Sequence, residues 1–399
     1  MKKAFVYTFG CKVNQYESQQ LIETLQKQGY EIADSAEEAE LSVVNSCTVT
    51  AQSDSQCRNI VRQISKKNPK SKIILTGCYA KRSKKELENI VPNLSVITDK
   101  KDILGTLPSQ LITRFDKHSR AFLKIQDGCD AYCSYCIVPY IRPKLSSKPI
   151  DSVLNEIKTL VSNGYSEIVL TGIHIGKYEY SLTELLKNIV SLPGNFRVRL
   201  SSIEINEISP ELIKLMAEFK EKLCCHLHIP LQSASKKILK KMNRKYTPKE
   251  FSEKMQLIYD YMPDAGITTD VIVGFPGEKE EDFKETLDFL NNNSFSRLHV
   301  FKFSERPNTP AANFEDKVPF DVIKDRATTL AKIDAELRER FWRKFIGTVR
   351  PSVIEETSNT LLTDNYIRLN FQSDFNNLPG GITKVTVFVR SGTPWGKFV

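Results

Sequence analysis

Strand-like and helical segments alternate along most of this chain, and this alternation constrains the fold more than any other feature. In residues 1–98, short apolar runs typical of β-strands are separated by stretches with the periodicity of amphipathic helices. Strands that alternate with helices form parallel sheets with helices packed on their faces. We expect strands at Ala4–Phe9, Leu41–Asn45, Lys72–Thr76 and Leu94–Thr98, and helices near 15–28, 51–67 and 81–90.

A second alternating series occupies residues 121–345. Its six predicted strand–helix units suit an open or partial (β/α)6 barrel, in which the functional loops follow the carboxyl ends of the strands. Residues 99–120 are charged and irregular, which predicts a linker before the barrel. The predicted strands are Ala121–Gln126, Glu167–Leu170, Arg197–Ser201, His226–Pro230, Thr268–Val273 and Leu298–Phe303, with helices near 150–163, 181–191, 209–221, 233–242, 248–261, 279–292 and 319–345.

Helical periodicity stops after residue 345. Short β runs at Thr348–Glu355, Tyr366–Phe371 and Lys384–Arg390 predict a small antiparallel barrel. The predicted fold class is therefore α/β with three parts. These parts are an amino-terminal parallel α/β sheet domain (1–98), a partial barrel with a trailing helix (121–345) that follows the linker (99–120), and a carboxy-terminal β-barrel (346–399).

Three cysteines, Cys129, Cys133 and Cys136, follow the first predicted strand of the barrel. A four-iron cluster normally takes four protein sulfurs, so three cysteines leave one iron with an open position where chemistry can occur. Zinc is the main alternative, but it prefers paired C-x2-C knuckles with a fourth Cys or His nearby, and no such pair follows. The spacing favours an iron–sulfur cluster, while zinc, a disulfide and simple packing stay open.

Three further cysteines, Cys11, Cys47 and Cys78, each stand between a predicted strand and the next helix. Because parallel strands end at the same edge of a sheet, we expect these cysteines to converge there. Gly10 and Gly77 would let the backbone approach a bulky ligand. The hypothesis is a second cluster held by three thiolates, and the alternative is that these cysteines are packing residues. Three other cysteines are interpreted as structural: Cys57, Cys224 and Cys225.

Composition sets wider limits. The chain has 399 residues, 40% hydrophobic and 26% charged, as in ordinary globular proteins. It contains no apolar run near the length of a membrane span, and its first residues lack a signal-peptide pattern. We therefore expect a cytoplasmic protein with no membrane contact and with reduced cysteines, whose odd number, nine, also disfavours a purely disulfide framework. The net charge of +9 permits a nucleic-acid partner without requiring one.

These motifs resemble those of the radical S-adenosylmethionine (SAM) methylthiotransferases over the whole chain. The barrel triplet matches that family's SAM-cluster triad, and Ile137–Tyr140 its usual continuation. His226–Ser233 and Thr269–Glu278 match further signatures, and residues 346–399 resemble its RNA-binding TRAM domain. By this resemblance, the amino-terminal triplet holds an auxiliary 4Fe–4S cluster.

Within the family, Gly10–Ser18 and Ser46–Thr50 are most similar to the threonylcarbamoyladenosine-tRNA branch. The resemblance implies an enzyme that adds a methylthio group to carbon 2 of N6-threonylcarbamoyladenosine, next to the anticodon. It implies two 4Fe–4S clusters and SAM as cofactors, with one SAM methylating a cluster-bound sulfur and a second providing the radical. Alternatives are methylthiolation of isopentenyladenosine in tRNA or of a ribosomal protein aspartate. The six intact cysteines argue against a non-catalytic RNA-binding metalloprotein.

Supporting residues follow from position and resemblance. Tyr135 is expected along the SAM adenine, with a packed aromatic as the alternative. Ser202 and Asp270, at predicted strand ends, are candidates for SAM hydroxyls or its amino group, or for caps of helices and turns. Basic side chains are candidates for substrate RNA: Arg142, Arg350, Arg368 and Arg390, with Lys384 and Trp395 beside them, and the run Lys236, Lys237, Lys240, Lys241, Arg244 and Lys245.

Three positions depart from the family pattern. Pro143 follows Arg142 where the family has an Arg-Gly stretch, Ala234 replaces a usual glycine, and Ile205 replaces a usual proline. These changes affect substrate contacts near Arg142 and SAM contacts near Ala234. The partners we expect are the anticodon arm of tRNA, an electron donor such as flavodoxin or ferredoxin, and a sulfur donor, with the enzyme itself a monomer.

Overall fold

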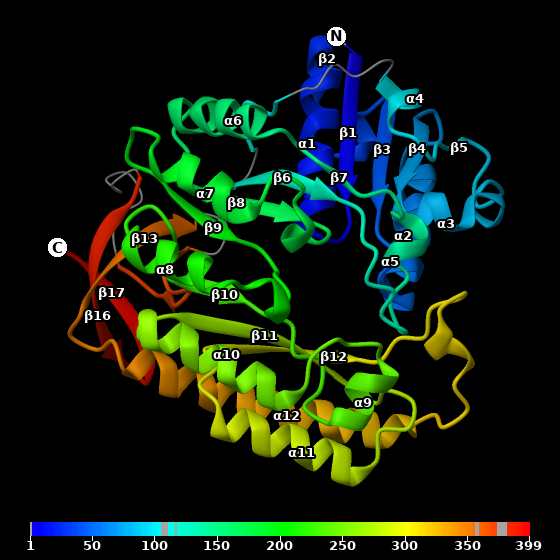
Figure 1. The fold of residues 1–399 in the computed structure, drawn as a ribbon. Helices are drawn as coiled ribbons and strands as arrows, with labels where there is room; N and C mark the ends of the chain where they lie inside the picture. Colours follow the sequence, from blue (N-terminus) through cyan, green and yellow to red (C-terminus); the bar gives the residue numbers. More distant parts are fainter. Residues whose placement is uncertain (1, 105–110, 116–117, 356–358, 373–380) are drawn as a thin grey trace.

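The structure is a computed structural model that describes residues 2–104, 111–115, 118–355, 359–372 and 381–399. Three parts follow one another along the chain, as Figure 1 shows from the blue amino-terminal domain to the red carboxy-terminal strands. The predicted α/β class with a parallel first sheet, a partial barrel and an antiparallel last domain is confirmed.

The amino-terminal domain is a five-stranded sheet in the order β2-β1-β3-β4-β5, with every neighbouring pair parallel. Alternate side chains of β1 serve opposite faces. Ala4 and Val6 pack with α1 and α4, whereas Phe5 and Tyr7 pack with α2 and α3. The elements are β1 (Lys2–Thr8), α1 (Lys12–Lys27), β2 (Tyr30–Ile32), β3 (Leu41–Ser46), α2 (Ala51–Lys67), β4 (Lys72–Gly77), α3 (Cys78–Leu87), β5 (Leu94–Val96) and α4 (Lys101–Leu104).

The central domain contains six parallel strands in two hydrogen-bonded groups, β6-β8-β9 and β10-β11-β12. Isolated bridges from Val198 to Leu223 and from Ser202 to His228 connect the groups. The short β7 (Ser146–Ser147) pairs antiparallel with β6 at the edge. The strands are β6 (Ala121–Asp127), β8 (Glu167–Gly172), β9 (Arg197–Leu200), β10 (His226–His228), β11 (Gly266–Val273) and β12 (Arg297–Lys302).

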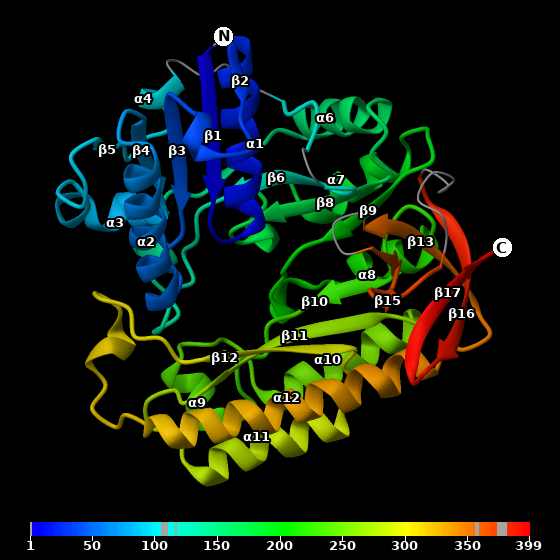
Figure 2. The ribbon, with the colours of Figure 1, turned by 180° about the vertical axis from the view of Figure 1, so that it is seen from behind.

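Helices cover the outer surface of this partial barrel. The long α12 (Phe320–Arg343) packs along β12, at the bottom of the view in Figure 2. The two faces of each strand differ in character, because Ile267 and Val271 of β11 join the apolar core while Thr268 and Asp270 point inward. The other helices are α5 (Val138–Ile141), α6 (Ile150–Ser162), α7 (Leu182–Val190), α8 (Pro210–Glu218), α9 (Lys236–Lys241), α10 (Pro248–Tyr261) and α11 (Glu280–Asn292).

The carboxy-terminal domain is an antiparallel sheet in the order β15-β14-β13-β16-β17. Backbone hydrogen bonds between Asn370 and both Pro394 (3.0 Å) and Gly396 (2.8 Å) join the two ends of the sheet and close a small barrel. Its core packs on Phe341 and Trp342 at the end of α12. The strands are β13 (Val349–Glu355), β14 (Thr360–Thr363), β15 (Arg368–Leu369), β16 (Thr383–Arg390) and β17 (Thr393–Phe398).

A buried group of charges joins this domain to the central barrel. Glu167 of β8 pairs with Arg197 (2.6 Å) and Arg199 (2.8 Å) of β9, and all three side chains are buried. The two arginines also donate to backbone carbonyls of the carboxy-terminal domain, Arg197 to Pro351 (2.8 Å) and Arg199 to Thr363 (3.0 Å). Burial alone would raise the pKa of Glu167, but the arginines hold it well below its ordinary value.

The element boundaries differ from the predictions where tertiary contacts decide them. α3 begins at Cys78 rather than near residue 81, and the predicted basic helix ends at Lys241. Ile112 and Phe115 of the predicted linker are buried in the barrel core, and residues 105–110 and 116–117 of that linker lie outside the described part. Strands β14 and β17 were not predicted. None of the helices described is both long and apolar enough to cross a lipid bilayer.

Replacing Glu167 with glutamine should destabilise the junction by about 3 kcal/mol, because it leaves buried arginines without their counter-charge. Both tryptophans belong to the carboxy-terminal core or its strands, so unfolding followed by tryptophan fluorescence reports on this junction. We expect a lower denaturation midpoint for Glu167→Gln at pH 7. The pair Glu184–Lys187 is exposed on α7, so Glu184→Gln should change the midpoint little.

The stabilisation by Glu167 should depend on pH in a defined direction. A carboxyl whose folded pKa is depressed stabilises the fold above its unfolded pKa, about 4.3 for glutamate, and this stabilisation is lost as the pH falls through the folded pKa. The difference between the wild type and Glu167→Gln should therefore shrink at strongly acidic pH. A difference that stays constant down to acid unfolding would contradict the ionised state of Glu167.

Candidate active site

Cys11, Cys47 and Cys78 meet at the carboxyl edge of the amino-terminal sheet. Cys11 caps α1 after β1, Cys47 follows β3 directly, and Cys78 is the first residue of α3 after β4. These three strands are neighbours, in the order β1-β3-β4. Burial raises the pKa of the Cys47 thiol to about 11, and the nearby Cys11 and Cys78 sulfurs add to the shift. The predicted convergence of the three cysteines is therefore what the structure shows.

Two glycines allow this approach. Gly10 has φ +91°, and a Cβ built there would lie 2.7 Å from the Cys47 sulfur. Gly77 has φ +94°, and a Cβ there would lie 2.4 Å from the carbonyl oxygen of Ser46. Both positions combine a left-handed backbone with a contact that no side chain can satisfy. Glycine at these two positions keeps the cysteine-bearing loops together.

Cys129, Cys133 and Cys136 lie on the loop after β6. The Cys136 amide donates to the Cys133 carbonyl (3.0 Å) and turns the chain. The loop is anchored on α9 and the residues after it, since the Ser134 hydroxyl donates to the Lys241 carbonyl (2.7 Å) and the Asn243 amide to the Tyr132 carbonyl (2.9 Å). The loop is thus held against the end of α9.

The spacing of the sulfur atoms distinguishes between possible metals. Three thiolates on a single zinc ion at about 2.3 Å would be about 3.8 Å apart. All six cysteines are among the described residues. In each triplet, at least two of the three sulfurs are more than 4.8 Å apart. A four-iron cubane binds each thiolate at a separate iron and needs the wider spacing. The observed spacing therefore disfavours a single zinc ion held by all three cysteines of either triplet.

Each triplet has at least one sulfur that contacts an arginine or a histidine. The Arg142 Nε lies 3.5 Å from the Cys78 sulfur, and the Arg244 Nη1 lies 3.4 Å from the Cys133 sulfur. His174 Nδ1 lies 3.5 Å from the Cys129 sulfur. Positive groups at this range favour the thiolate form that metal ligation requires. Hydrogen bonds to sulfur also tune the potential of an iron–sulfur cluster.

Arg142 is therefore placed differently from the predicted RNA contact. Its guanidinium is buried and pairs with Glu17 of α1 (2.9 Å) and Asp127 of β6 (2.8 Å). Its backbone carbonyl accepts from the Cys129 amide (3.0 Å). Arg142 thus touches both triplets, and its donors are used inside the protein.

Arg244 also departs from expectation. It was predicted on a basic helical surface for RNA, but it follows α9, is nearly buried, and pairs with Glu204. The Tyr246 hydroxyl lies 3.2 Å from its Nε. The basic helix therefore presents only its lysines to solvent. Arg244 instead contacts the loop that carries Cys129, Cys133 and Cys136.

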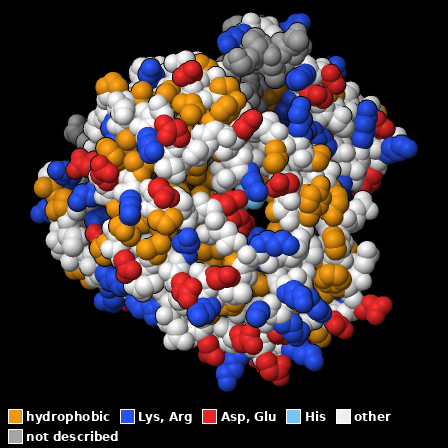
Figure 3. All heavy atoms as spheres, in the orientation of Figure 1, with side chains coloured by type: hydrophobic (Ala, Val, Ile, Leu, Met, Phe, Trp, Pro, Cys, Tyr) orange, Lys and Arg blue, Asp and Glu red, His pale blue; other side chains and the backbone are white. Residues whose placement is uncertain are grey.

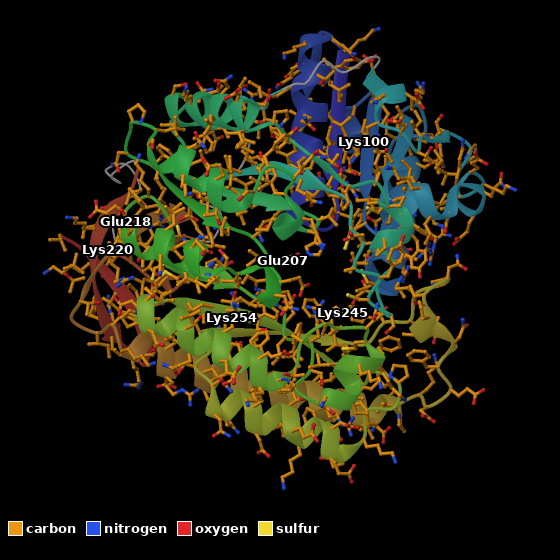
Figure 4. All side chains as sticks on the ribbon, in the orientation of Figure 1. Lys100, Glu207, Glu218, Lys220, Lys245 and Lys254 are labelled. Carbon is orange, nitrogen blue, oxygen red and sulfur yellow. The ribbon has the colours of Figure 1, made fainter. Side chains whose placement is uncertain are left out.

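His174 and Glu207 were missed by the sequence analysis. His174 Nε2 lies 2.8 Å from Glu207 Oε1, so the imidazole connects a carboxylate to the Cys129 sulfur. Burial lowers the pKa of His174, but the contacts with Cys129 and Glu207 outweigh it and raise the value to about 10. His174 follows the end of β8, the same signal that identified the cysteines. Figure 4 places Glu207 at the central opening, across from Lys245.

The predicted SAM contacts come from three parts of the barrel: Tyr135 from the loop after β6, Ser202 from the segment after β9, and Asp270 from β11. Asp270 lies between His228 Nε2 (3.2 Å) and His299 Nδ1 (3.3 Å), and the ligand atoms of all three lie within 4.8 Å of one another. Burial would raise the pKa of Asp270, but the two imidazoles hold it well below its usual range. Ser202 is exposed next to His228, and Tyr135 packs beside Phe275, so it stays a candidate both for SAM and for packing.

The three predicted RNA-binding arginines of the last domain differ in environment. Arg350 is buried between Asp264 (2.8 Å) and Asp364 (2.6 Å), so it supports the domain junction instead of facing solvent. Arg368 pairs with Glu355 (2.8 Å). Arg390 is exposed and lies 5.0 Å from the centre of the Trp395 ring. Arg390 is therefore the best placed of the three for a nucleic acid.

Two family models match the chain. The radical SAM superfamily model covers residues 123–290, which include the Cys129 triplet, and the model named uncharacterized protein family UPF0004 covers residues 3–99, which include the Cys11 triplet. A radical SAM protein uses SAM and a 4Fe–4S cluster, in agreement with the donor set on the barrel loop. Among solved structures, the radical SAM methyltransferase TsrM from Kitasatospora setae shares the fold, with a TM-score of 0.57 and 14% identity over 78% of this chain and 77% of that one.

Relatives with close sequence similarity extend over nearly the whole chain. The threonylcarbamoyladenosine tRNA methylthiotransferase MtaB of Thermotoga maritima is 38% identical over 89% of this chain and 87% of that protein. MtaB of Bacillus subtilis is 35% identical over 98% and 95%. The tRNA-2-methylthio-N(6)-dimethylallyladenosine synthase of Aquifex aeolicus is 34% identical over 98% and 97%. Similarity of this extent, with both cysteine triplets in place, means that the chain belongs to the radical SAM methylthiotransferase family.

Proposed function

We propose that this protein is a tRNA-modifying enzyme that adds a methylthio group to carbon 2 of N6-threonylcarbamoyladenosine, next to the anticodon. The observation that carries this proposal is the pair of cysteine triplets facing one domain junction, with Arg142 in contact with both. The relatives named MtaB favour the threonylcarbamoyl substrate, at up to 38% identity. The dimethylallyladenosine relatives, at up to 34% among those described here, make that adenosine the second candidate.

When bound, SAM and two 4Fe–4S clusters would supply the radical, the methyl group and the sulfur that this reaction needs. Cys129, Cys133 and Cys136 would hold the SAM cluster, and Cys11, Cys47 and Cys78 the auxiliary one. The protein's own part is to keep the thiolates ionised, to orient them and to exclude water. Arg142, Arg244 and His174 serve the first two tasks through their contacts with sulfur.

The inner wall supplies polar groups for the substrates. Tyr135, Ser202 and Asp270 stay our candidates for SAM, with His228 and His299 fixing the Asp270 carboxylate as an acceptor. Figure 3 shows the molecule hollowed near its centre, with basic and acidic side chains around the rim. The carboxy-terminal barrel, as a TRAM-like domain, would hold the anticodon arm. A flavodoxin or ferredoxin as electron donor, a separate sulfur donor, and a monomeric cytoplasmic enzyme complete the proposal.

The substrate is tested by nucleoside mass spectrometry of tRNA from a strain that lacks this gene. We expect the 2-methylthio derivative of threonylcarbamoyladenosine to disappear and its unthiolated precursor to accumulate. Restoring the gene should bring the derivative back. Loss of the dimethylallyl derivative instead would select the second candidate, and an unchanged tRNA profile would contradict both tRNA substrates.

Single cysteine variants should show that the two triplets serve different steps of the reaction. Cys133→Ala should abolish SAM cleavage, whereas Cys47→Ala should keep 5′-deoxyadenosine formation but stop methylthiolation. Iron analysis under anaerobic conditions should give about eight irons per chain for the wild type and about four for each variant. Cys57→Ala is the matched control, because Cys57 is buried on α2 in the same domain, belongs to neither triplet, and should leave both activities intact when replaced. Methylthiolation by Cys47→Ala would refute the auxiliary cluster.

RNA contact by the last domain is tested with Arg390→Ala. Because Arg390 is exposed beside Trp395, its loss should weaken tRNA binding several-fold and lower the slope of log K against log salt by about one. Arg343→Ala removes an exposed charge at the end of α12, where Arg343 pairs with Glu339 (2.7 Å), and serves as the control. Equal weakening by both variants would show that total charge, and not this site, governs binding.

A further inference from the structure

Lys12 is the first residue of α1 and follows Cys11 directly. Helix α1 lies between the amino-terminal sheet and strands β6 and β8 of the barrel, so its first turn stands where the two domains meet (Figures 1 and 2). The Lys12 side chain is half-buried. Within the part of the chain that the structure describes, its ammonium group makes no hydrogen bond or ion pair.

Lys12 is close enough to the barrel strands for its positive charge to affect two rings there. It acts on His226 of β10 and on Tyr366 of the carboxy-terminal domain, whose rings stack at 4.3 Å. Burial chiefly lowers the pKa of His226, and Arg199 and Lys12 add to the effect. Burial would raise the pKa of Tyr366, but Arg368, Lys12 and other cations lower it. Arg199 (5.1 Å) and Arg368 (5.5 Å) lie over the Tyr366 ring, and Lys12 adds to the positive charge that this ring experiences.

The other cations of this group are neutralised by the protein. Arg120 pairs with Glu167 (3.2 Å) and Glu355 (2.5 Å), Arg199 with Glu167 (2.8 Å), and Arg368 with Glu355 (2.8 Å). Lys12 differs from them, because no carboxylate among the described residues balances it. A partly desolvated charge without a counter-charge is costly, and an anionic ligand would remove that cost.

A second polar group in the same place lacks a partner. His226 is buried, and its Nε2 lies 3.1 Å from the Thr268 hydroxyl, but its Nδ1 has no hydrogen-bond partner among the described residues. Buried polar atoms of this kind are normally satisfied by protein, water or ligand. Lys12, which adjoins Cys11 in the sequence, thus provides a charge, and His226 provides a hydrogen-bonding atom on the inner side of the barrel.

We propose that Lys12 binds the carboxylate of the threonylcarbamoyl side chain of the substrate adenosine. The inference rests on the proposed function, in which carbon 2 of the adenine approaches the Cys11 triplet. The N6 substituent then lies close to the residue next to Cys11. A threonylcarbamoyl group ends in a carboxylate and a hydroxyl, whereas a dimethylallyl group is apolar, so an unpaired ammonium distinguishes the two. The alternative anion is a tRNA phosphate, which every tRNA carries.

The test measures binding to the anaerobic holoenzyme of two tRNAs that differ only in the threonylcarbamoyl group. The wild type should bind the modified tRNA more tightly. Lys12→Met, which removes the charge and keeps the length, should weaken binding of the modified tRNA about tenfold or more and leave the unmodified tRNA unchanged. Lys12→Arg should keep most of the preference. Lys27→Met, at the far end of the same helix, is the charge-matched control.

The outcomes separate the possible roles. Equal weakening for both tRNAs would assign Lys12 to a phosphate and overturn the proposal, as would an unchanged preference. Iron content and 5′-deoxyadenosine formation without tRNA should stay at wild-type levels, and Lys12→Gln replaces Lys12→Met if that variant loses iron. Loss of iron in both variants would mean a structural role and would also overturn it. A wild type that never methylthiolates threonylcarbamoyladenosine would refute the proposed function itself, which is a different result.

Discussion

The Arg142 guanidinium is the contact on which the arrangement of the two cysteine triplets depends. It lies between Glu17 of the amino-terminal domain and Asp127 of the barrel, while its Nε reaches the Cys78 sulfur and its carbonyl holds the Cys129 amide. A buried arginine is stable only when such partners surround it, and removing one partner of a buried pair typically costs 3–5 kcal/mol. The geometry that satisfies Arg142 is therefore also the geometry that sets the two triplets against each other.

Buried arginines also connect the domains at the other junctions. Arg306, after β12, is buried and donates to the Thr48 hydroxyl (3.0 Å) and to Asp54, so the barrel holds the residue after Cys47. Arg197 and Arg199 join the barrel to the last domain in a similar way. Charged contacts of this kind require one geometry, whereas apolar contacts tolerate sliding. The domains are thus oriented by directional contacts, as a reaction across a junction requires.

The strands and helices were predictable because local periodicity determines them, and the convergence of Cys11, Cys47 and Cys78 followed from the rule that parallel strands end at one edge. The partners of the sulfurs were not predictable in the same way. Arg244 was read as a solvated cation because its neighbours are lysines, and only the turn after α9 buries it against Cys133. Arg142 and Arg350 were predicted as substrate contacts, but both are buried against carboxylates. The sequence alone does not show which carboxylates lie across a domain boundary.

The charges on the inner wall form a consistent pattern. Glu167, Glu355 and Asp270 each contact arginines or histidines of the protein, so these three carboxylates offer little free negative charge to repel a polyanion such as RNA. Arg142, Arg197 and Arg199 are equally engaged, so they could bind phosphates only by breaking buried pairs, whereas Arg390 is exposed. Among the described residues, Lys12 next to Cys11 carries a charge that no ion pair balances, which is why we assign recognition to it. With Lys12 in the proposed role, the site would discriminate between substrates by the position of a single charge.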